Sequence, residues 1–190
     1  MLLHKYIETN NINGILEMIR NKKLKKNDIV MRYYTGYTPL LLASYHGHLE
    51  IVKLLITVGN LQKDDMLLRS GSEMRNNNGE TPLFMASYYG HLEIVKLLIA
   101  LCCREDIMIK NNDGDTALFM ASARGHLEIV KLLIKKGNLP LRIKEDIMMK
   151  NNNGTSAYNV AKNQSIKQLF DNILFNEVIN DMIIDITIIL

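Results

Sequence analysis

The chain has no tryptophan and only two cysteines among its 190 residues. These two, Cys102 and Cys103, are adjacent, and a disulfide between neighbouring residues is strained. So few thiols argue against a disulfide-stapled secreted scaffold and favour a reducing, intracellular compartment, most simply the cytoplasm. Nor do two thiols make a metal site by themselves, and the nearby sequence offers no further ligands.

Long apolar runs are missing at both ends of the chain. The N-terminal MLLHKYIETN has no apolar core long enough for a secretion signal. The C-terminal MIIDITIIL follows Asp181 and contains Asp185, and these two residues interrupt the apolar run well short of the roughly 20 residues that a membrane helix needs. We therefore expect no membrane span.

A strong charge of one sign is also missing, because 23 basic and 20 acidic residues leave a net charge of +3. Nucleic-acid binding usually needs a basic face, so no nucleic-acid partner is expected. The densest basic run is either a solvated loop or a nucleic-acid or targeting patch. It consists of Lys22, Lys23, Lys25 and Lys26.

What the chain does contain is internal repetition, which decides the fold. The decapeptide GHLEIVKLLI occurs unchanged at 47–56, 90–99 and 125–134. Before each copy stands a second match, and a weaker one follows the last copy. These are GYTPLLLAS at 36–44, GETPLFMAS at 79–87, GDTALFMAS at 114–122 and GTSAYNVAK at 154–162.

Each repeat predicts a pair of antiparallel helices. Thr81-Pro82 is typical of a helix start, where a hydroxyl caps free N–H groups and proline suits the first position. Gly90 stands where the first helix must reverse, and a second apolar helix follows, with Glu93 and Lys96 on its outer surface. The Asn78-Gly79 pair predicts a tight turn. The stretches that precede the equivalent turns of the later repeats, DIMIK (106–110) and DIMMK (146–150), are expected to be extended.

These motifs resemble the ankyrin repeat, whose pattern is D-G-x-T-P-L-H-x-A followed by G-H-L-E-I-V-x-L-L. The resemblance implies an all-α solenoid of helix–turn–helix units with hairpin-like turn tips, in which neighbouring units must stack to bury their apolar faces. It covers about residues 27–162. In place of the family histidine after T-P-L stand Leu41, Phe84, Phe119 and Asn159, so apolar contact is expected to replace its hydrogen bond.

The repeats divide the chain unevenly, since their spacing exceeds the usual 33 residues. The excess lies in 57–75 and 135–150, which are either tolerated insertions or added contact elements. We expect a helix pair at 2–9 and 12–20 as an N-terminal cap. The predicted organisation is a repeat domain at 1–172, with a cap at 1–26, full repeats at about 27–65, 70–103 and 105–136, a degenerate repeat at 146–172, and an apolar helix or tail at 173–190.

Ankyrin-like stacks bind partners through a concave face, formed by the turn tips and the free side of the first helices. Five of the eight tyrosines map to such free positions, which predicts a tyrosine-lined groove; alternatively, the rings pack on neighbouring repeats. The predicted partner-binding residues are Tyr34, Tyr37, Tyr45, His46, Tyr88, Tyr89, Asp113, Asp115 and Arg124.

No catalytic or metal-binding constellation stands out. His48, His91 and His126 recur with the repeat, so they lie about one repeat apart and are expected to bind backbone groups at the inter-helix turn. The recurring carboxylates of the second helices are surface residues, and phosphate loops and nucleophile motifs are missing. We therefore expect no enzyme activity and no cofactor.

Three functions remain open at this stage. The chain is a monomeric adaptor that binds a protein through the concave face, a regulatory inhibitor or effector that uses the inserted loops or the C-terminal tail, or an enzyme, which is the least favoured. The tail 173–190 is either a helix that covers the last repeat or a docking helix. The partner itself is not encoded in any motif.

Overall fold

The computed structural model describes residues 2–25, 28–29, 31–33, 36–59, 74–102, 104–136 and 143–189, with the side chains of Arg104 and of 177–189 excepted. The helices are α1 (Leu2–Glu8), α2 (Ile12–Arg20), α4 (Pro39–His46), α5 (Leu49–Val58), α7 (Pro82–Tyr89), α8 (Leu92–Leu101), α9 (Arg104–Ile107), α10 (Ala117–Arg124), α11 (Leu127–Lys136), α12 (Ile143–Met148), α13 (Ala157–Val160) and α14 (Gln164–Ile189).

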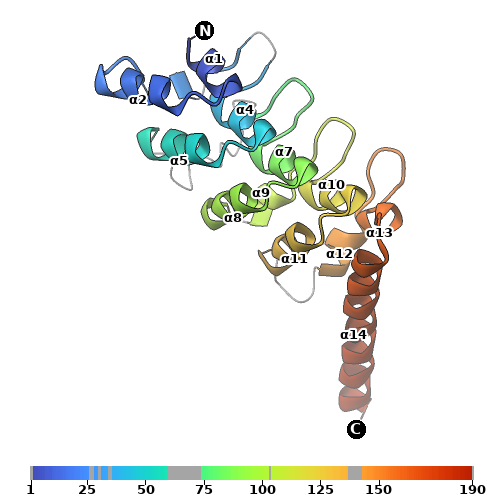
Figure 1. Cartoon of the computed structure of the whole chain (residues 1–190). Helices are drawn as coiled ribbons and strands as arrows, with labels where there is room; N and C mark the ends of the chain where they lie inside the picture. The colour runs from blue at the N-terminus through green and yellow to red at the C-terminus, as the bar shows by residue number, and fades with distance from the viewer. Residues whose placement is uncertain are drawn as a thin grey trace.

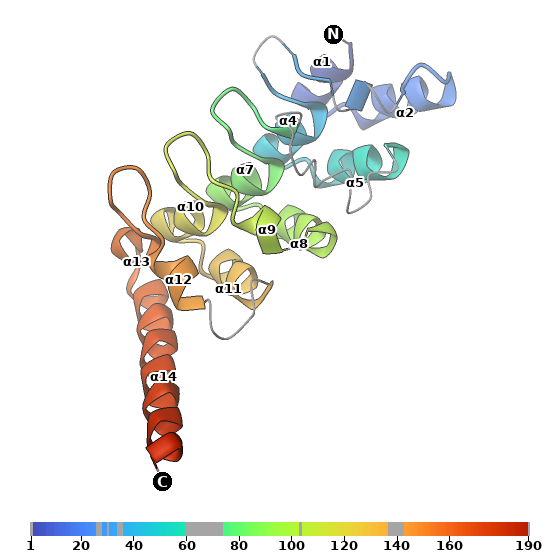
Figure 2. The ribbon, with the colours of Figure 1, turned by 180° about the vertical axis from the view of Figure 1, so that it is seen from behind.

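These helices stack in two rows, as Figure 1 shows. The inner row consists of α1, α4, α7, α10 and α13, each in contact with the next, and the outer row consists of α2, α5, α8 and α11. Hairpins project from the inner row on one side, and the view from behind shows the same order (Figure 2). Within the described ranges there is no strand, only an isolated antiparallel bridge between Lys150 and Ser156. The all-α repeat solenoid is confirmed.

The inner helices begin and end at the residues that the sequence predicts. Thr81 Oγ1 accepts a hydrogen bond from Phe84 N at 3.1 Å, and Pro82 is the first residue of α7. Gly90 ends this helix with φ +81°, in the left-handed region that favours glycine. The same threonine and glycine caps recur at α4 and α10.

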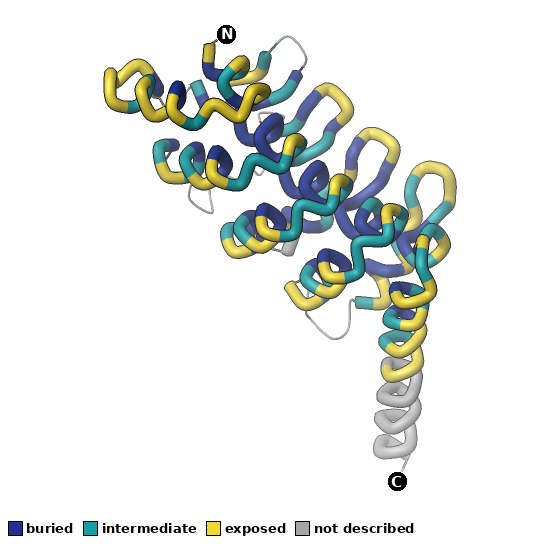
Figure 3. The backbone as a smooth tube through the Cα atoms, in the orientation of Figure 1, coloured by how far each residue is buried: buried dark blue, intermediate teal, exposed yellow. Residues whose placement is uncertain are grey.

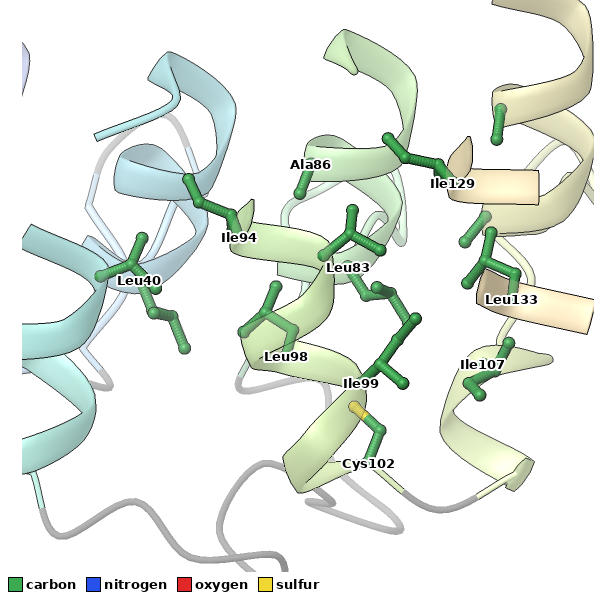
Figure 4. Packing of buried hydrophobic residues seen from close by; sticks show 14 of the residues in the cluster. Leu40, Leu83, Ala86, Ile94, Leu98, Ile99, Cys102, Ile107, Ile129 and Leu133 are labelled. Carbon is green, nitrogen blue, oxygen red and sulfur yellow. The ribbon is translucent and has the colours of Figure 1, made fainter. Parts of the chain in front are cut away.

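Burial runs without a break along the stack. One cluster of buried apolar residues extends from Leu3 to Phe170. In its middle, Figure 4 shows Ala86 of α7 between Ile94 of α8 and Ile129 of α11, all three members of this cluster, and the small alanine suits the packing of α7 on α8. Exposed residues lie on the hairpin tips, on the outer surface of the outer row, at the ends of the inner helices and on α14 (Figure 3). No repeat therefore buries its apolar face alone.

Two expectations for the segments before the hairpins are wrong. Residues 106–107 and 146–148 are helical, in α9 and α12, rather than extended. A helical turn places Ile107 and Ile147 in the core, where 2% and 0% of their surface is exposed. Both short helices also carry two acidic residues in the first turn, where they interact favourably with the helix dipole.

The two ends of the stack differ. The predicted N-terminal helix pair is confirmed as α1 and α2, and Ile15 is fully buried like its repeat equivalent Ile51. At the other end, α13 has only four residues, and α14 follows it as one helix of 26 residues. Ile166 and Phe170 near its start are fully buried, and the helix then runs away from the stack (Figure 1). Segment 173–190 thus belongs largely to α14.

Candidate protein-binding surface

Three of the hairpin tips are built around an asparagine: Asn76, Asn111 and Asn151. Asn111 Oδ1 accepts hydrogen bonds from the backbone N–H groups of Asp113, at 3.0 Å, and Asp115, at 2.8 Å. The tips are also joined to each other. Asn112 donates its backbone N–H to Asn78 O at 2.9 Å and its side-chain amide to Asn77 O at 3.0 Å. The tips therefore form a continuous, preorganised row.

Beside this row, four tyrosines form a connected chain of rings, which we call the tyrosine strip: Tyr37, Tyr45, Tyr89 and Tyr88. The Tyr37 and Tyr45 ring centroids are 6.0 Å apart, edge to face. Tyr45 and Tyr89 are 4.7 Å apart, and Tyr89 and Tyr88 are also 4.7 Å apart. These separations lie within the favourable range for aromatic pairs, so the strip is held by its own contacts.

The strip crosses from one repeat to the next by a repeated diagonal contact. Tyr45 and Tyr88 occupy the position two before the reversing glycine, and Tyr89 and Arg124 the position one before it in the following repeat. Tyr45 packs on Tyr89, and one repeat later the guanidinium carbon of Arg124 lies 4.0 Å from the Tyr88 ring centroid. Arg124 therefore continues the strip with a cation–π contact.

The strip is partly open to solvent, and burial raises the pKa of two of its phenols, Tyr37 and Tyr89. Tyr89 is 43% exposed, while the other three rings are half-buried. Burial, a hydrogen bond with Tyr45 and the nearby Glu80 raise the pKa of Tyr89 to about 12. Burial likewise raises the pKa of Tyr37. These phenols are therefore protonated at physiological pH and can donate hydrogen bonds.

Beneath the strip lies a small apolar layer at the positions of the missing histidine. Leu41, Phe84 and Met85 are buried together, with Tyr37 and Tyr45 packed against them. Apolar contact thus replaces the hydrogen bond in these two repeats, as predicted. In the last repeat the same position, Asn159, closes a capping box with Ser156 instead.

The recurring histidines join consecutive repeats. His91 Nε2 lies 3.1 Å from Tyr45 O, and His126 Nε2 lies 3.1 Å from Tyr88 O. Because a carbonyl only accepts, Nε2 must carry the hydrogen in both rings. The predicted role in binding backbone groups is therefore confirmed for these two, whereas His48 Nε2 is buried with no hydrogen-bond partner among the described residues. Among the described residues, no group of three or more metal-ligating side chains comes together.

Comparison with known proteins assigns the family. The family model described as "Ankyrin repeats (3 copies)" matches residues 3–107, 60–142 and 99–178. The chain belongs to the ankyrin repeat family. No curated protein matches its sequence. Ankyrin repeats are generally protein–protein interaction modules and typically not enzymes, and no helix within the described part of this one is long and apolar enough to cross a membrane.

On the ankyrin stack, the predicted partner-binding residues fall into three groups. Tyr37, Tyr45, Tyr88, Tyr89 and Arg124 meet in the tyrosine strip and its extension. His46 is exposed and joins the strip through Tyr45, at 4.8 Å between ring centroids, while Asp113 is exposed on a hairpin tip. Tyr34 lies outside the described residues.

Asp115 needs a correction. It is only 6% exposed, and Asn151 of the next repeat donates a hydrogen bond to its carboxylate at 2.8 Å. Burial raises its pKa, and the hydrogen bond from Asn151 partly opposes that shift. Asp115 thus joins two repeats of the ankyrin stack, so we remove it from the candidate binding surface.

Sequence reasoning missed a column of basic residues that precedes the hairpin tips. Each of its members stands four positions before a tip glycine, a constant offset that could have been read from the repeat. We call this set the basic column: Arg32, Arg75, Lys110 and Lys150. Arg75 is half-buried, and the other three are exposed.

Proposed function

We propose that this ankyrin stack is an adaptor that binds a protein partner through the concave face predicted from the family resemblance, with the tyrosine strip at its centre. The observation that carries the proposal is the connected chain of rings from Tyr37 to Tyr88, continued by Arg124. Tyrosine and arginine are the residue types that most often dominate binding energy at protein interfaces.

Preorganisation supports the proposal further. The rings are held by one another and by the apolar layer of Leu41, Phe84 and Met85, so little side-chain freedom remains to be lost on binding. Neutral phenols combine a large contact area with hydroxyl groups that can hydrogen-bond to a partner backbone. A folded or extended protein segment could therefore gain affinity here without ordering the surface first.

A pull-down tests the proposal. We expect the unchanged chain to capture a protein that is lost when Tyr45, Tyr88 and Tyr89 are changed to alanine, because truncation of a central tyrosine costs on the order of 2 kcal/mol. Tyr158→Ala is the matched control, since Tyr158 lies away from the strip and hydrogen-bonds to Asp171 at 2.7 Å. Equal capture by the triple variant and the unchanged chain, both folded by circular dichroism, would refute the proposal.

A second candidate is an inhibitor or effector that acts through the inserted loops or the C-terminal helix. One observation favours the helix: Phe175 of α14 is 64% exposed, and α14 extends beyond the last repeat (Figure 1). Most of the two inserted loops, 60–73 and 137–142, lies outside the described residues. Replacing only 60–73 and 137–142 by short linkers, which keeps α12 and its buried Ile147, tests the loops, since the adaptor should keep its partner.

A further inference from the structure

The basic column carries charge that no described residue neutralises. None of its four cations forms an ion pair with another described residue. Within the described part of the chain, the charged groups of the column make one polar contact, in which Lys110 Nζ donates to Lys150 O at 3.1 Å. This contact carries the Lys110 side chain along the stack to the next repeat. The column is therefore an open, directional row of positive charge.

A second repeating set of lysines, on the outer helices, is ion-paired and serves as a comparison for the basic column. Lys53, Lys96 and Lys131 are also spaced one repeat apart, but each is bound to the glutamate three positions earlier, at 2.7, 2.7 and 2.8 Å. Among the described residues, one repeating set of cations is thus neutralised and the other has no acidic partner. A free periodic set of this kind fits a partner with complementary charge.

The separation of the cations in the column, compared with the spacing of charges along a polymer, indicates which kind of partner could pair with them. Packed helices lie about 8–10 Å apart, so equivalent cations in successive repeats are separated by about 10 Å. An extended segment in the polyproline II conformation advances about 3.1 Å per residue and completes one turn every three residues, so it presents every third side chain to the same side at about the separation of one repeat. A nucleic-acid strand carries a phosphate every ~3.4 Å, so every third phosphate would match the column as well, but a net charge of +3 does not favour so densely charged a polyanion.

We infer that the basic column receives an extended acidic segment of the partner, with a carboxylate at every third residue, laid along the row of hairpins. The inference rests on the proposed function, since the segment would bind beside the tyrosine strip. Arg75 directly precedes Asn76, whose side chain hydrogen-bonds to Tyr37 of the strip. Exposed Asp113 repels carboxylates at the tip, which confines the segment to the column side of the hairpins.

Two synthetic peptides test the inference. One repeats Glu-Ser-Ser and ends in glutamate, and the other has the same composition with its glutamates in one block. We expect the spaced peptide to bind several-fold more tightly, in NMR titrations at low ionic strength, with shifts at Lys110 and Lys150. Changing Arg75, Lys110 and Lys150 to glutamine should weaken it about tenfold, as expected for the loss of three exposed ion pairs.

The matched control is the chain with Lys53, Lys96 and Lys131 changed to glutamine, which has the same net charge as the column variant. It should bind the spaced peptide within about twofold of the unchanged chain. Equal weakening by the two variants, no preference between the peptides, or tighter binding of oligothymidylate than of the spaced peptide would each overturn the inference.

The same variants distinguish this inference from the proposed function. If the pulled-down partner is lost with the tyrosine variant but kept with the column variant, the adaptor proposal holds, and the inference that the partner's acidic segment binds the basic column fails. If the partner survives the tyrosine variant, the adaptor proposal fails by itself, whatever the peptides show.

Discussion

Replacing the histidines one at a time tests how the repeats are joined. His126→Ala removes the hydrogen bond to Tyr88 O and leaves that carbonyl short of a partner. A lost hydrogen bond costs about 1 kcal/mol and a desolvated carbonyl about 1 kcal/mol more, so we expect about 2 kcal/mol of destabilisation. For a chain of this length, that lowers Tm by about 4–8 °C.

His48 supplies the control within the same molecule. It occupies the equivalent position, but no described residue hydrogen-bonds to its buried Nε2, so His48→Ala should cost about 1 kcal/mol less than His126→Ala. His91→Ala should match His126→Ala, because both rings contact a carbonyl of the preceding repeat at 3.1 Å. Thermal unfolding followed by circular dichroism gives the Tm of each of the three variants and so ranks their losses of stability. Equal losses for all three variants would refute the assigned role of these hydrogen bonds.

The dependence of Tm on acidic pH should report on the same histidine, His126. Burial, with Lys162 and Arg124 nearby, lowers the pKa of His126 below 6.5. The folded state therefore favours the neutral ring, and this contribution to stability is present above pH 6.5 and lost as the pH falls through the lowered pKa. The Tm of the unchanged chain should fall more steeply below pH 6.5 than that of His126→Ala. Parallel curves would contradict this assignment.

Three further outcomes follow from the packing and the strip. Leu98→Ala should cost about 2–5 kcal/mol in denaturant unfolding, because this side chain is fully buried between repeats. Gly90→Ala should lower Tm, since the added carbon would lie 2.6 Å from His126 Cε1 at a φ of +81°. Ultraviolet titration should show a tyrosine that ionises near pH 12, and Tyr89→Phe should remove that transition. Because the pKa of Tyr89 is raised in the folded state, the stability that this phenol contributes is present below pH 10 and is lost as the pH rises toward 12.

Much of the fold could be predicted because the determinants are local and repeated. The threonine caps, the reversing glycines and the apolar stripe each specify the same helix pair, and their recurrence requires stacking. The helices α9 and α12 were missed because burial of Ile107 and Ile147 depends on the neighbouring repeats, which a short segment such as DIMIK does not reveal.

The candidate site was less predictable, because exposure in a hairpin depends on the next one. Asp115 occupies a free position of the motif, yet Asn151 from the following repeat covers it. The tyrosines were found because their ring size suits an interface, whereas the diagonal contact from Tyr88 to Arg124 requires the register between repeats. The basic column was overlooked because its members precede the tips rather than form them.

Photo-cross-linking tests the central claim most directly. With p-benzoylphenylalanine in place of Tyr89, 43% exposed at the middle of the strip, irradiation should attach the protein that the triple tyrosine variant fails to capture. The same probe in place of Tyr158 should not. Attachment of that protein from Phe175 of α14, with none from Tyr89, would contradict the account and place binding on the C-terminal helix.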